Sequence, residues 1–198
     1  SGGATCNRNW LSQPAASEAT KQALMTTNPL DRLTRVIPDW PVEGVSFQDL
    51  TGVLADSEGL SYVAEELAAP FREAGITLVA GMEARGFIVG TAVARELGVG
   101  FVALRKAGKL PGPVHSADYA LEYGTATIEV HHQDVPTSAR VLVIDDVLAT
   151  GGTAVAAVEV LEKCGATVVG LGFILALDFL GGTSRLGRHT VHTLRTIS

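Results

Sequence analysis

The sequence predicts an α/β fold, a single domain in which a mainly parallel sheet is flanked by helices. Apolar runs of strand length alternate along the chain with segments of helical periodicity, the pattern of parallel strands joined by helices. Residues 141–144 form a continuous apolar run rich in β-branched side chains, as expected of a strand buried on both faces. With 198 residues, 46% of them hydrophobic, the chain can bury one such core.

The N-terminal segment, residues 1–28, differs in composition from the rest. It is rich in Ser, Thr, Asn, Gln and Ala and shows little apolar periodicity. A segment of this kind buries too little apolar surface to fold by itself. We therefore expect a partly disordered tail over 1–28 and the folded domain over 29–198.

The first half of the domain carries helix and strand signals. Asp56 is a candidate N-cap, and Leu60, Val63 and Leu67 follow at helical spacing, so a helix is predicted to start there. Pro70 should bend or end this helix. The elements predicted next are a strand over 76–80, a helix over 86–97 and a strand over 100–104.

The second half begins with a polar stretch, residues 105–123, that is rich in Lys, Pro, Gly and Tyr. We expect a long flexible loop here, because such loops inside a compact domain are usually functional or mobile. Gly165 is the expected stop of a helix over 152–163. The remaining predicted elements are strands over 125–130, 141–144, 167–177 and 191–194.

Charge and cysteine content argue against several classes of protein. A formal net charge of −6 disfavours broad binding to nucleic acid, which needs a positive field. Two cysteines are too few for a disulfide framework and favour a reducing compartment. No apolar run has the length of a membrane span, and the first residues lack the pattern of a signal peptide. We expect a cytoplasmic protein without nucleic-acid or membrane partners.

The sharpest functional signal follows the apolar run 141–144. Two carboxylates, Asp145 and Asp146, lead into a Thr-Gly-Gly-Thr turn, residues 150–153, that opens a helix. Glycines let backbone N–H groups approach an anion closely, and a helix N-terminus adds partial positive charge. The turn therefore suits a phosphate monoester, and the carboxylates suit ribose hydroxyls or a Mg²⁺ ion held through water. Neither a Walker A loop nor the dinucleotide-binding fingerprint is present at this turn.

The run 141–153 resembles the phosphoribosyl pyrophosphate motif of type I phosphoribosyltransferases. The resemblance implies that fold, a loop that holds the 5-phosphate and an acidic pair beside the ribose hydroxyls. It also implies Mg²⁺ as cofactor, held through substrate and water near the acidic pair rather than by direct protein ligands. The residues to which it assigns these roles are Asp145, Asp146, Ala149, Thr150, Gly151, Gly152 and Thr153.

Two further segments resemble adenine phosphoribosyltransferases. Residues 36–50 resemble their small N-terminal hood, which implies that Phe47 stacks on the base while the backbones of Ser46 and Gln48 read its edge. Many relatives carry Arg at the position of Gln48. Residues 81–87 resemble the pyrophosphate loop, which implies a cis bond between Glu83 and Ala84. It also implies a pyrophosphate contact from the fork-shaped guanidinium of Arg85.

A third segment, over 104–112 and 119–124, resembles the flexible loop of the same enzymes. The resemblance implies that Lys106 and Lys109 neutralise the leaving pyrophosphate, and that Arg105 serves the neighbouring subunit of a homodimer. Glu122 is the implied proton-transfer residue, and Tyr123 follows it in the same Leu-Glu-Tyr-Gly segment.

Together these segments imply an enzyme of purine salvage. It would transfer the phosphoribosyl group of phosphoribosyl pyrophosphate to adenine, giving AMP and pyrophosphate. One departure is Ala176, where relatives often have Glu. Two alternatives stay open: a phosphoribosyltransferase for another purine base, and a regulatory protein that senses phosphoribosyl pyrophosphate.

Overall fold

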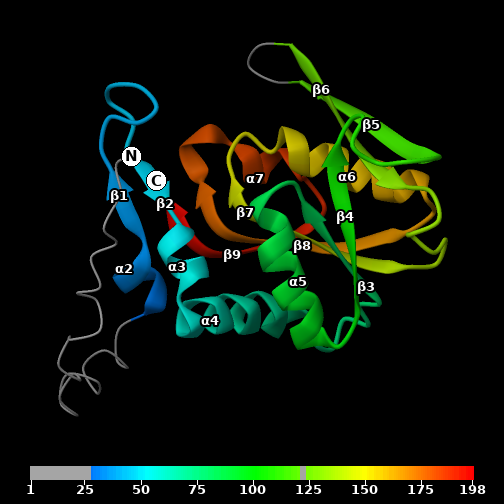
Figure 1. Cartoon of the computed structure of the whole chain (residues 1–198), viewed down its shortest axis with the longest axis horizontal. Helices are drawn as coiled ribbons and strands as arrows, with labels where there is room; N and C mark the ends of the chain where they lie inside the picture. Colours follow the sequence, from blue (N-terminus) through cyan, green and yellow to red (C-terminus); the bar gives the residue numbers. More distant parts are fainter. Residues whose placement is uncertain (1–27, 121–123) are drawn as a thin grey trace, which may run out of the picture.

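The fold is built on a seven-stranded sheet in the order β5-β6-β4-β3-β7-β8-β9 (Figure 1). The computed structural model describes residues 28–120 and 124–198. Strands β4, β3, β7, β8 and β9 run parallel, whereas β6 pairs antiparallel with both β4 and β5. The strands are β3 Leu78–Met82, β4 Gly100–Lys106, β5 Val114–Ala120, β6 Thr125–His131, β7 Arg140–Leu148, β8 Thr167–Leu177 and β9 Thr190–Ile197. The mainly parallel α/β sheet confirms the predicted fold class.

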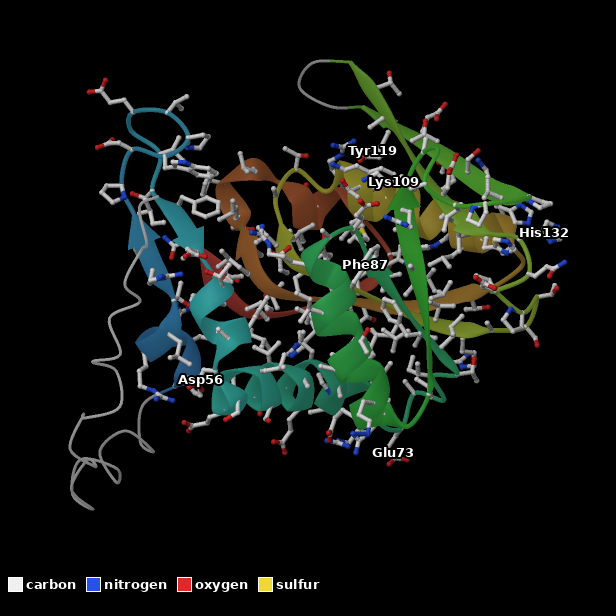
Figure 2. The ribbon with its side chains drawn as sticks, viewed as in Figure 1. Asp56, Glu73, Phe87, Lys109, Tyr119 and His132 are labelled. Carbon is white, nitrogen blue, oxygen red and sulfur yellow. The ribbon has the colours of Figure 1, made fainter. Side chains whose placement is uncertain are left out.

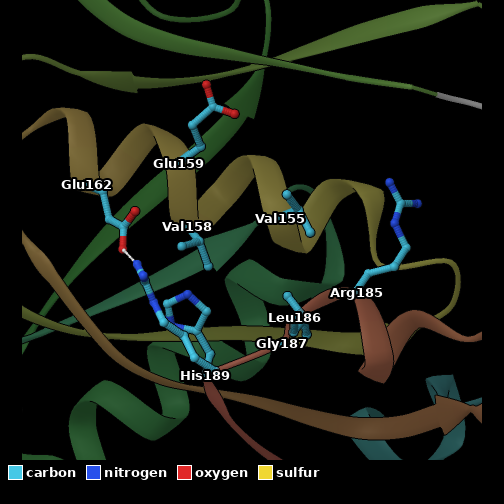
Figure 3. Close-up of a pocket in the computed structure, with 9 residues that line it drawn as sticks. Val155, Val158, Glu159, Glu162, Arg185, Leu186, Gly187 and His189 are labelled. Carbon is cyan, nitrogen blue, oxygen red and sulfur yellow. Dashed lines mark hydrogen bonds and ion pairs between the residues drawn. The ribbon is translucent and has the colours of Figure 1, made fainter.

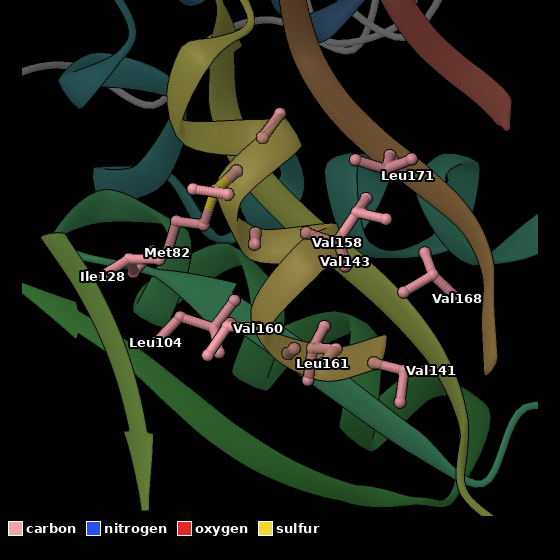
Figure 4. Packing of buried hydrophobic residues seen from close by; sticks show 14 of the residues in the cluster. Met82, Leu104, Ile128, Val141, Val143, Val158, Val160, Leu161, Val168 and Leu171 are labelled. Atoms are coloured by element: carbon pink, nitrogen blue, oxygen red, sulfur yellow. The ribbon is translucent and has the colours of Figure 1, made fainter. Parts of the chain in front are cut away.

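Three long helices cover the two faces of this sheet: α4 Ser57–Ala68, α5 Arg85–Leu97 and α6 Gly152–Lys163. Side chains alternate between the faces along β7, as they do in any strand. Val141 and Val143 pack with α6 in one core cluster (Figure 4). Leu142 and Ile144 pack with α4 and α5 in the other cluster. The apolar run 141–144 is therefore buried on both faces, as predicted.

Smaller elements lie around the sheet, and the sequence analysis did not predict where any of them begins or ends. At the N-terminal side these are α2 Pro29–Leu33, β1 Arg35–Ile37, β2 Phe47–Asp49 and α3 Thr51–Ala55. Strands β1 and β2 form a separate antiparallel pair that lies beside the end of β9 (Figure 1). The other small elements are the 3₁₀ turns η2 Ala69–Phe71 and η3 Asp178–Leu180, and the helix α7 Gly182–Arg185.

Several local predictions are confirmed. The Asp56 side chain accepts a 2.9 Å hydrogen bond from the backbone N–H of Gly59, so it caps α4 as expected (Figure 2). The same helix ends at Ala68, and Pro70 lies in the 3₁₀ turn that follows. The predicted strand over 76–80 is displaced, because β3 spans Leu78–Met82.

The prediction of a long loop over 105–123 is wrong for much of that segment. Strand β4 continues through Lys106, and β5 pairs with β6 in an unbroken antiparallel register. The strand escaped prediction because only one of its faces packs on the core: Ala117 and Tyr119 lie in the core cluster beneath α6, while the exposed Ser116 and Asp118 alternate with them. Residues 107–113 do lie outside the strands.

Strand β7 also runs further than predicted, through the aspartate pair to Leu148. Its neighbour β3 stops pairing at Ile144, whereas β8 stays paired as far as Leu148. Asp145 and Asp146 therefore lie inside a strand, at a corner where the sheet narrows, rather than just after its end. Within the part of the chain that the structure describes, no helix is long and apolar enough to cross a membrane.

Candidate active site

The predicted phosphate turn connects β7 to the first turn of α6. Residues 149–153 surround a cavity of about 80 Å³ together with Met82, Asp145 and Phe173. Gly151 is the N-cap of α6 with a φ of 78°, a left-handed conformation that glycine adopts without strain. No side chain of the described residues caps α6, so its first N–H groups remain available to an anion. The five residues predicted to hold a phosphate are thus brought together around one cavity.

The aspartate pair lies beside this cavity and is largely buried. Asp146 is 6% exposed and forms an ion pair with the guanidinium of Arg85, from the start of α5. That ion pair places Arg85 Nε against the Oδ2 atom of Asp146, which has no other partner among the described residues. Asp145 Oδ1 accepts a 2.9 Å hydrogen bond from the backbone N–H of Asp146. Burial and the Asp146 carboxylate raise the pKa of Asp145 well above its usual range.

Three of the predicted pyrophosphate residues, Glu83, Arg105 and Lys109, form an ionic cluster at the ends of β3 and β4, whereas Arg85 pairs with Asp146 instead. The Glu83–Ala84 peptide bond is cis, as the resemblance implies. Glu83 Oε1 lies 2.8 Å from Lys109 Nζ, and Glu83 Oε2 lies 3.4 Å from Arg105 Nε. The backbone N–H of Lys106 donates a 3.1 Å hydrogen bond to Glu83 Oε2. Figure 2 shows Lys109 beyond the end of β4.

Glu83 is the centre of that cluster. Its side chain is 13% exposed, against 49% for Lys109 and 33% for Arg105. The hydrogen bond from Lys109, the Lys106 amide and the Arg105 charge lower the pKa of Glu83 to about 2, against the opposing effect of burial. Two of the cations predicted to meet pyrophosphate are therefore bound to a carboxylate of the same chain.

The predicted base residues line a second, apolar pocket of about 370 Å³. Ser46, Phe47 and Gln48 contribute one wall from β2 and the turn before it. The Phe47 ring is braced by Trp40, with ring centroids 4.5 Å apart in an edge-to-face contact. The remaining lining residues are Gly44, Val45, Val147, Leu175, Leu177, Phe179 and Ile197.

Sequence reasoning missed the second wall of the pocket and the helix α7. The wall comes from the ends of β7, β8 and β9, which only the strand order brings beside residue 47. Helix α7 contacts the phosphate turn, because Arg185 Nη1 donates a 3.1 Å hydrogen bond to the carbonyl of Thr150. The only available signal was the Gly181–Gly182 pair. The predicted Glu122 and Tyr123 lie outside the described residues.

The chain resembles enzymes of one kind in sequence and in structure. The phosphoribosyl transferase domain family matches residues 54–179. The adenine phosphoribosyltransferase of Streptomyces clavuligerus is 55% identical over 152 residues, which cover 77% of this chain and 85% of that one. The crystal structure of adenine phosphoribosyltransferase from Thermoanaerobacter pseudethanolicus matches with a TM-score of 0.81 and 40% identity, covering 85% of this chain and 98% of that chain. The Giardia lamblia enzyme complexed with 9-deazaadenine matches with a TM-score of 0.80 and 38% identity, covering 87% and 99%.

Proposed function

The chain belongs to the adenine phosphoribosyltransferases, the purine-salvage enzymes that make AMP and pyrophosphate from adenine and phosphoribosyl pyrophosphate, and we propose that the two cavities at the narrowed sheet corner form its active site. The observation that carries the proposal concerns Val147, which lines both the phosphate cavity and the apolar pocket. AMP joins a phosphate to a base through one ribose, so its two recognition sites must adjoin. Asp145 lines the phosphate cavity two residues before Val147, and we assign the sugar to the aspartate pair.

In this proposal the turn 149–153 binds the 5-phosphate. Backbone N–H groups at the start of α6, and the hydroxyls of Thr150 and Thr153, are the donors. Asp145 and Asp146 accept hydrogen bonds from the ribose hydroxyls. Because these contacts hold the sugar on a rigid strand and turn, they orient the anomeric carbon toward the base.

The pyrophosphate of the substrate is assigned to the loop that carries Glu83, Ala84 and Arg85, together with Lys106 and Lys109. Arg105 is assigned to the same site in the neighbouring subunit. As the bond to the anomeric carbon breaks, the leaving pyrophosphate gains charge and the ribose becomes oxocarbenium-like. Fixed cations placed where that charge develops lower the barrier to bond breaking. The Arg85 guanidinium, already directed at the sheet corner by Asp146, lies between the sugar and pyrophosphate sites.

The donor set of the corner fits Mg²⁺. Asp146 is a buried carboxylate whose Oδ2 atom contacts only Arg85 among the described residues, and Asp145 lies next to it. Carboxylate oxygens are the ligands this hard cation prefers, through water where the geometry is open. When bound, the ion would neutralise charge on the pyrophosphate oxygens. Both aspartates would hold it through its water shell.

Adenine is assigned to the apolar pocket. Phe47 stacks on one face of the base, and the wall opposite, which includes Val147 and Leu175, contacts the other face. The backbones of Ser46 and Gln48 read the edge of the base. The Giardia enzyme, which shares this fold, is complexed with 9-deazaadenine, and this supports an adenine-like ligand for the chain.

Glu122 is proposed as the general base that accepts the proton adenine loses on attack, with Tyr123 beside it in the loop. Closure of the segment 105–123 over the site would exclude the water that otherwise hydrolyses the activated sugar. We further propose a cytoplasmic homodimer in which Arg105 serves the partner's pyrophosphate site.

The test is product analysis with adenine, guanine and hypoxanthine, each offered with phosphoribosyl pyrophosphate and Mg²⁺. We expect AMP and pyrophosphate in equal amounts from adenine and far slower turnover of the other bases. Equal or faster turnover of guanine or hypoxanthine would overturn the assignment of the apolar pocket to adenine.

A further inference from the structure

The phosphate turn is in backbone contact with the short helix α7. A Cβ atom at Gly182 would lie 2.1 Å from the carbonyl oxygen of Ala149 and 3.0 Å from the nitrogen of Gly151. A Cβ atom at Gly151 would in turn lie 2.8 Å from the Gly182 carbonyl oxygen. No side chain fits at such distances, so this approach requires glycine on both segments.

A second contact fixes the same turn. Arg185 Nη1 donates its 3.1 Å hydrogen bond to the carbonyl of Thr150, the residue between the two backbone contacts. Figure 3 shows Arg185 beside the N-terminal end of α6, at one end of a groove of about 410 Å³. The next residue, Leu186, is 3% exposed and packs in the core, so it anchors α7.

These contacts determine where the amides of the turn point. In a trans peptide the carbonyl and the following N–H point in opposite directions. The carbonyls of Ala149 and Thr150 face Gly182 and Arg185. The N–H of Thr150 therefore points away from Gly182 and the N–H of Gly151 points away from the Arg185 guanidinium, in a turn whose residues line the phosphate cavity.

We propose that Gly182 and Arg185 are positioning residues for the 5-phosphate: they hold the carbonyls of the turn so that its N–H groups converge on the anion. The inference rests on the proposed assignment of residues 149–153 to the 5-phosphate. It adds two residues far along the chain, neither of which lines the phosphate cavity. Preorganised N–H groups bind an anion more tightly because the turn loses less entropy on binding.

The experiment measures inhibition by two ligands. Ribose 5-phosphate carries the 5-phosphate and the sugar of the substrate, whereas pyrophosphate carries neither the 5-phosphate nor the sugar. The full chain is compared with Arg185→Met, which removes the donor, and Arg185→Lys, which keeps one. Arg188→Met is the matched control, because Arg188 is 81% exposed and pairs with Glu162 rather than with the turn. The melting temperature of each variant reports on folding.

We expect Arg185→Met to raise the inhibition constant of ribose 5-phosphate, and the KM for phosphoribosyl pyrophosphate, about three- to tenfold, the range of one hydrogen bond. Inhibition by pyrophosphate should change less than about twofold, and Arg185→Lys should recover most of the loss. Gly182→Ala should weaken ribose 5-phosphate binding more, because the backbone of the turn must move. Its control is Gly100→Ala, whose Cβ would make an ordinary 3.5 Å contact with Leu78.

The inference is overturned if Arg185→Met behaves like Arg188→Met, or if both ligands weaken equally, since general destabilisation would do the latter. Thr150→Val combined with Thr153→Val separates this outcome from failure of the proposed function. If that pair leaves ribose 5-phosphate binding intact, the assignment of the turn is wrong. If it weakens binding while Arg185→Met does not, the turn binds phosphate but α7 does not position it.

Discussion

Replacing Glu83 by glutamine keeps the shape of the side chain and removes the charge at the centre of the cationic cluster. In the folded chain this carboxylate pairs with Lys109 and Arg105 and accepts the amide of Lys106. The glutamine oxygen can still accept one hydrogen bond. The substitution therefore isolates the contribution of the charge, and two measurements follow from it, one of stability and one of ligand binding.

The magnitude follows from the pKa of Glu83, which falls from 4.5 to about 2 on folding. A pKa difference of about 2.5, at about 1.4 kcal/mol per unit, corresponds to about 3 kcal/mol of stabilisation. This figure is an upper bound, because Lys109 and Arg105 are 49% and 33% exposed and solvent screens their charges. We expect Glu83→Gln to lower the free energy of unfolding by about 1–2 kcal/mol at pH 7.

The pH dependence of that difference is fixed in sign. Because the pKa of Glu83 is lowered on folding, its contribution is fully present above pH 4.5 and is lost as the pH falls toward 2. Urea unfolding of both proteins between pH 7 and pH 4 should show a constant difference that begins to shrink near pH 4.5. Glu129→Gln is the control, since Glu129 accepts the Gly108 amide but forms no ion pair with a described residue.

The same substitution should strengthen inhibition by pyrophosphate. Glu83 competes for the cations that the proposed mechanism assigns to this ligand, so its removal should lower the inhibition constant several-fold. The reasoning is refuted if Glu83→Gln is as stable as the parent at pH 7. It is equally refuted if the variant binds pyrophosphate more weakly, because Glu83 would then hold the cations in their productive positions.

Three further predictions concern the substrate contacts. Asp145→Asn with Asp146→Asn should abolish turnover while unfolding in urea remains cooperative, and near-normal turnover would contradict the assignment of the pair to ribose and Mg²⁺. Glu122→Gln should lower kcat about 10²- to 10⁴-fold with little change in the KM for phosphoribosyl pyrophosphate, as loss of a general base does; a loss below threefold would leave Glu122 as a plain loop residue. Phe47→Ala should raise the KM for adenine about tenfold, the scale of one aromatic stacking contact, and an unchanged KM would move the base elsewhere.

The sequence was most informative where one short segment carries a complete function. The phosphate turn is local: a buried strand, two carboxylates and a glycine turn follow one another, so spacing alone predicts an anion site. The roles of Phe47, Glu83 and Glu122, in contrast, came from resemblance, because a lone aromatic or a lone carboxylate has no such local signature. Of these, Phe47 lines the apolar pocket and Glu83 lies in the cationic cluster, while Glu122 is not described.

The rest of the site could not be predicted because it depends on strand order and strand length. Ile197 meets Phe47 only because β9 adds to the sheet next to β8 and its end passes the β1–β2 pair. Arg185 contacts Thr150 only because β7 and β8 are parallel neighbours. The phosphate turn follows β7 and α7 follows β8, so both lie at the same edge of the sheet. Hydrophobic periodicity indicates which face of a strand is buried but not which strand is its neighbour.

Strand length also explains why the aspartates are at the centre of the site. Strand β3 stops pairing with β7 at Ile144, while β8 continues to support β7 for four more residues. Over that stretch β7 is paired with β8 but not with β3, and the guanidinium of Arg85, from the start of α5, pairs with Asp146. Asp145 and Asp146 are thus held with the rigidity of a strand, and Asp145 borders the phosphate cavity while Val147, two residues further on, lines both cavities. Had β7 ended at Ile144, as its apolar run suggests, the carboxylates would lie on a turn, without the support of β8 that fixes their positions relative to the phosphate turn.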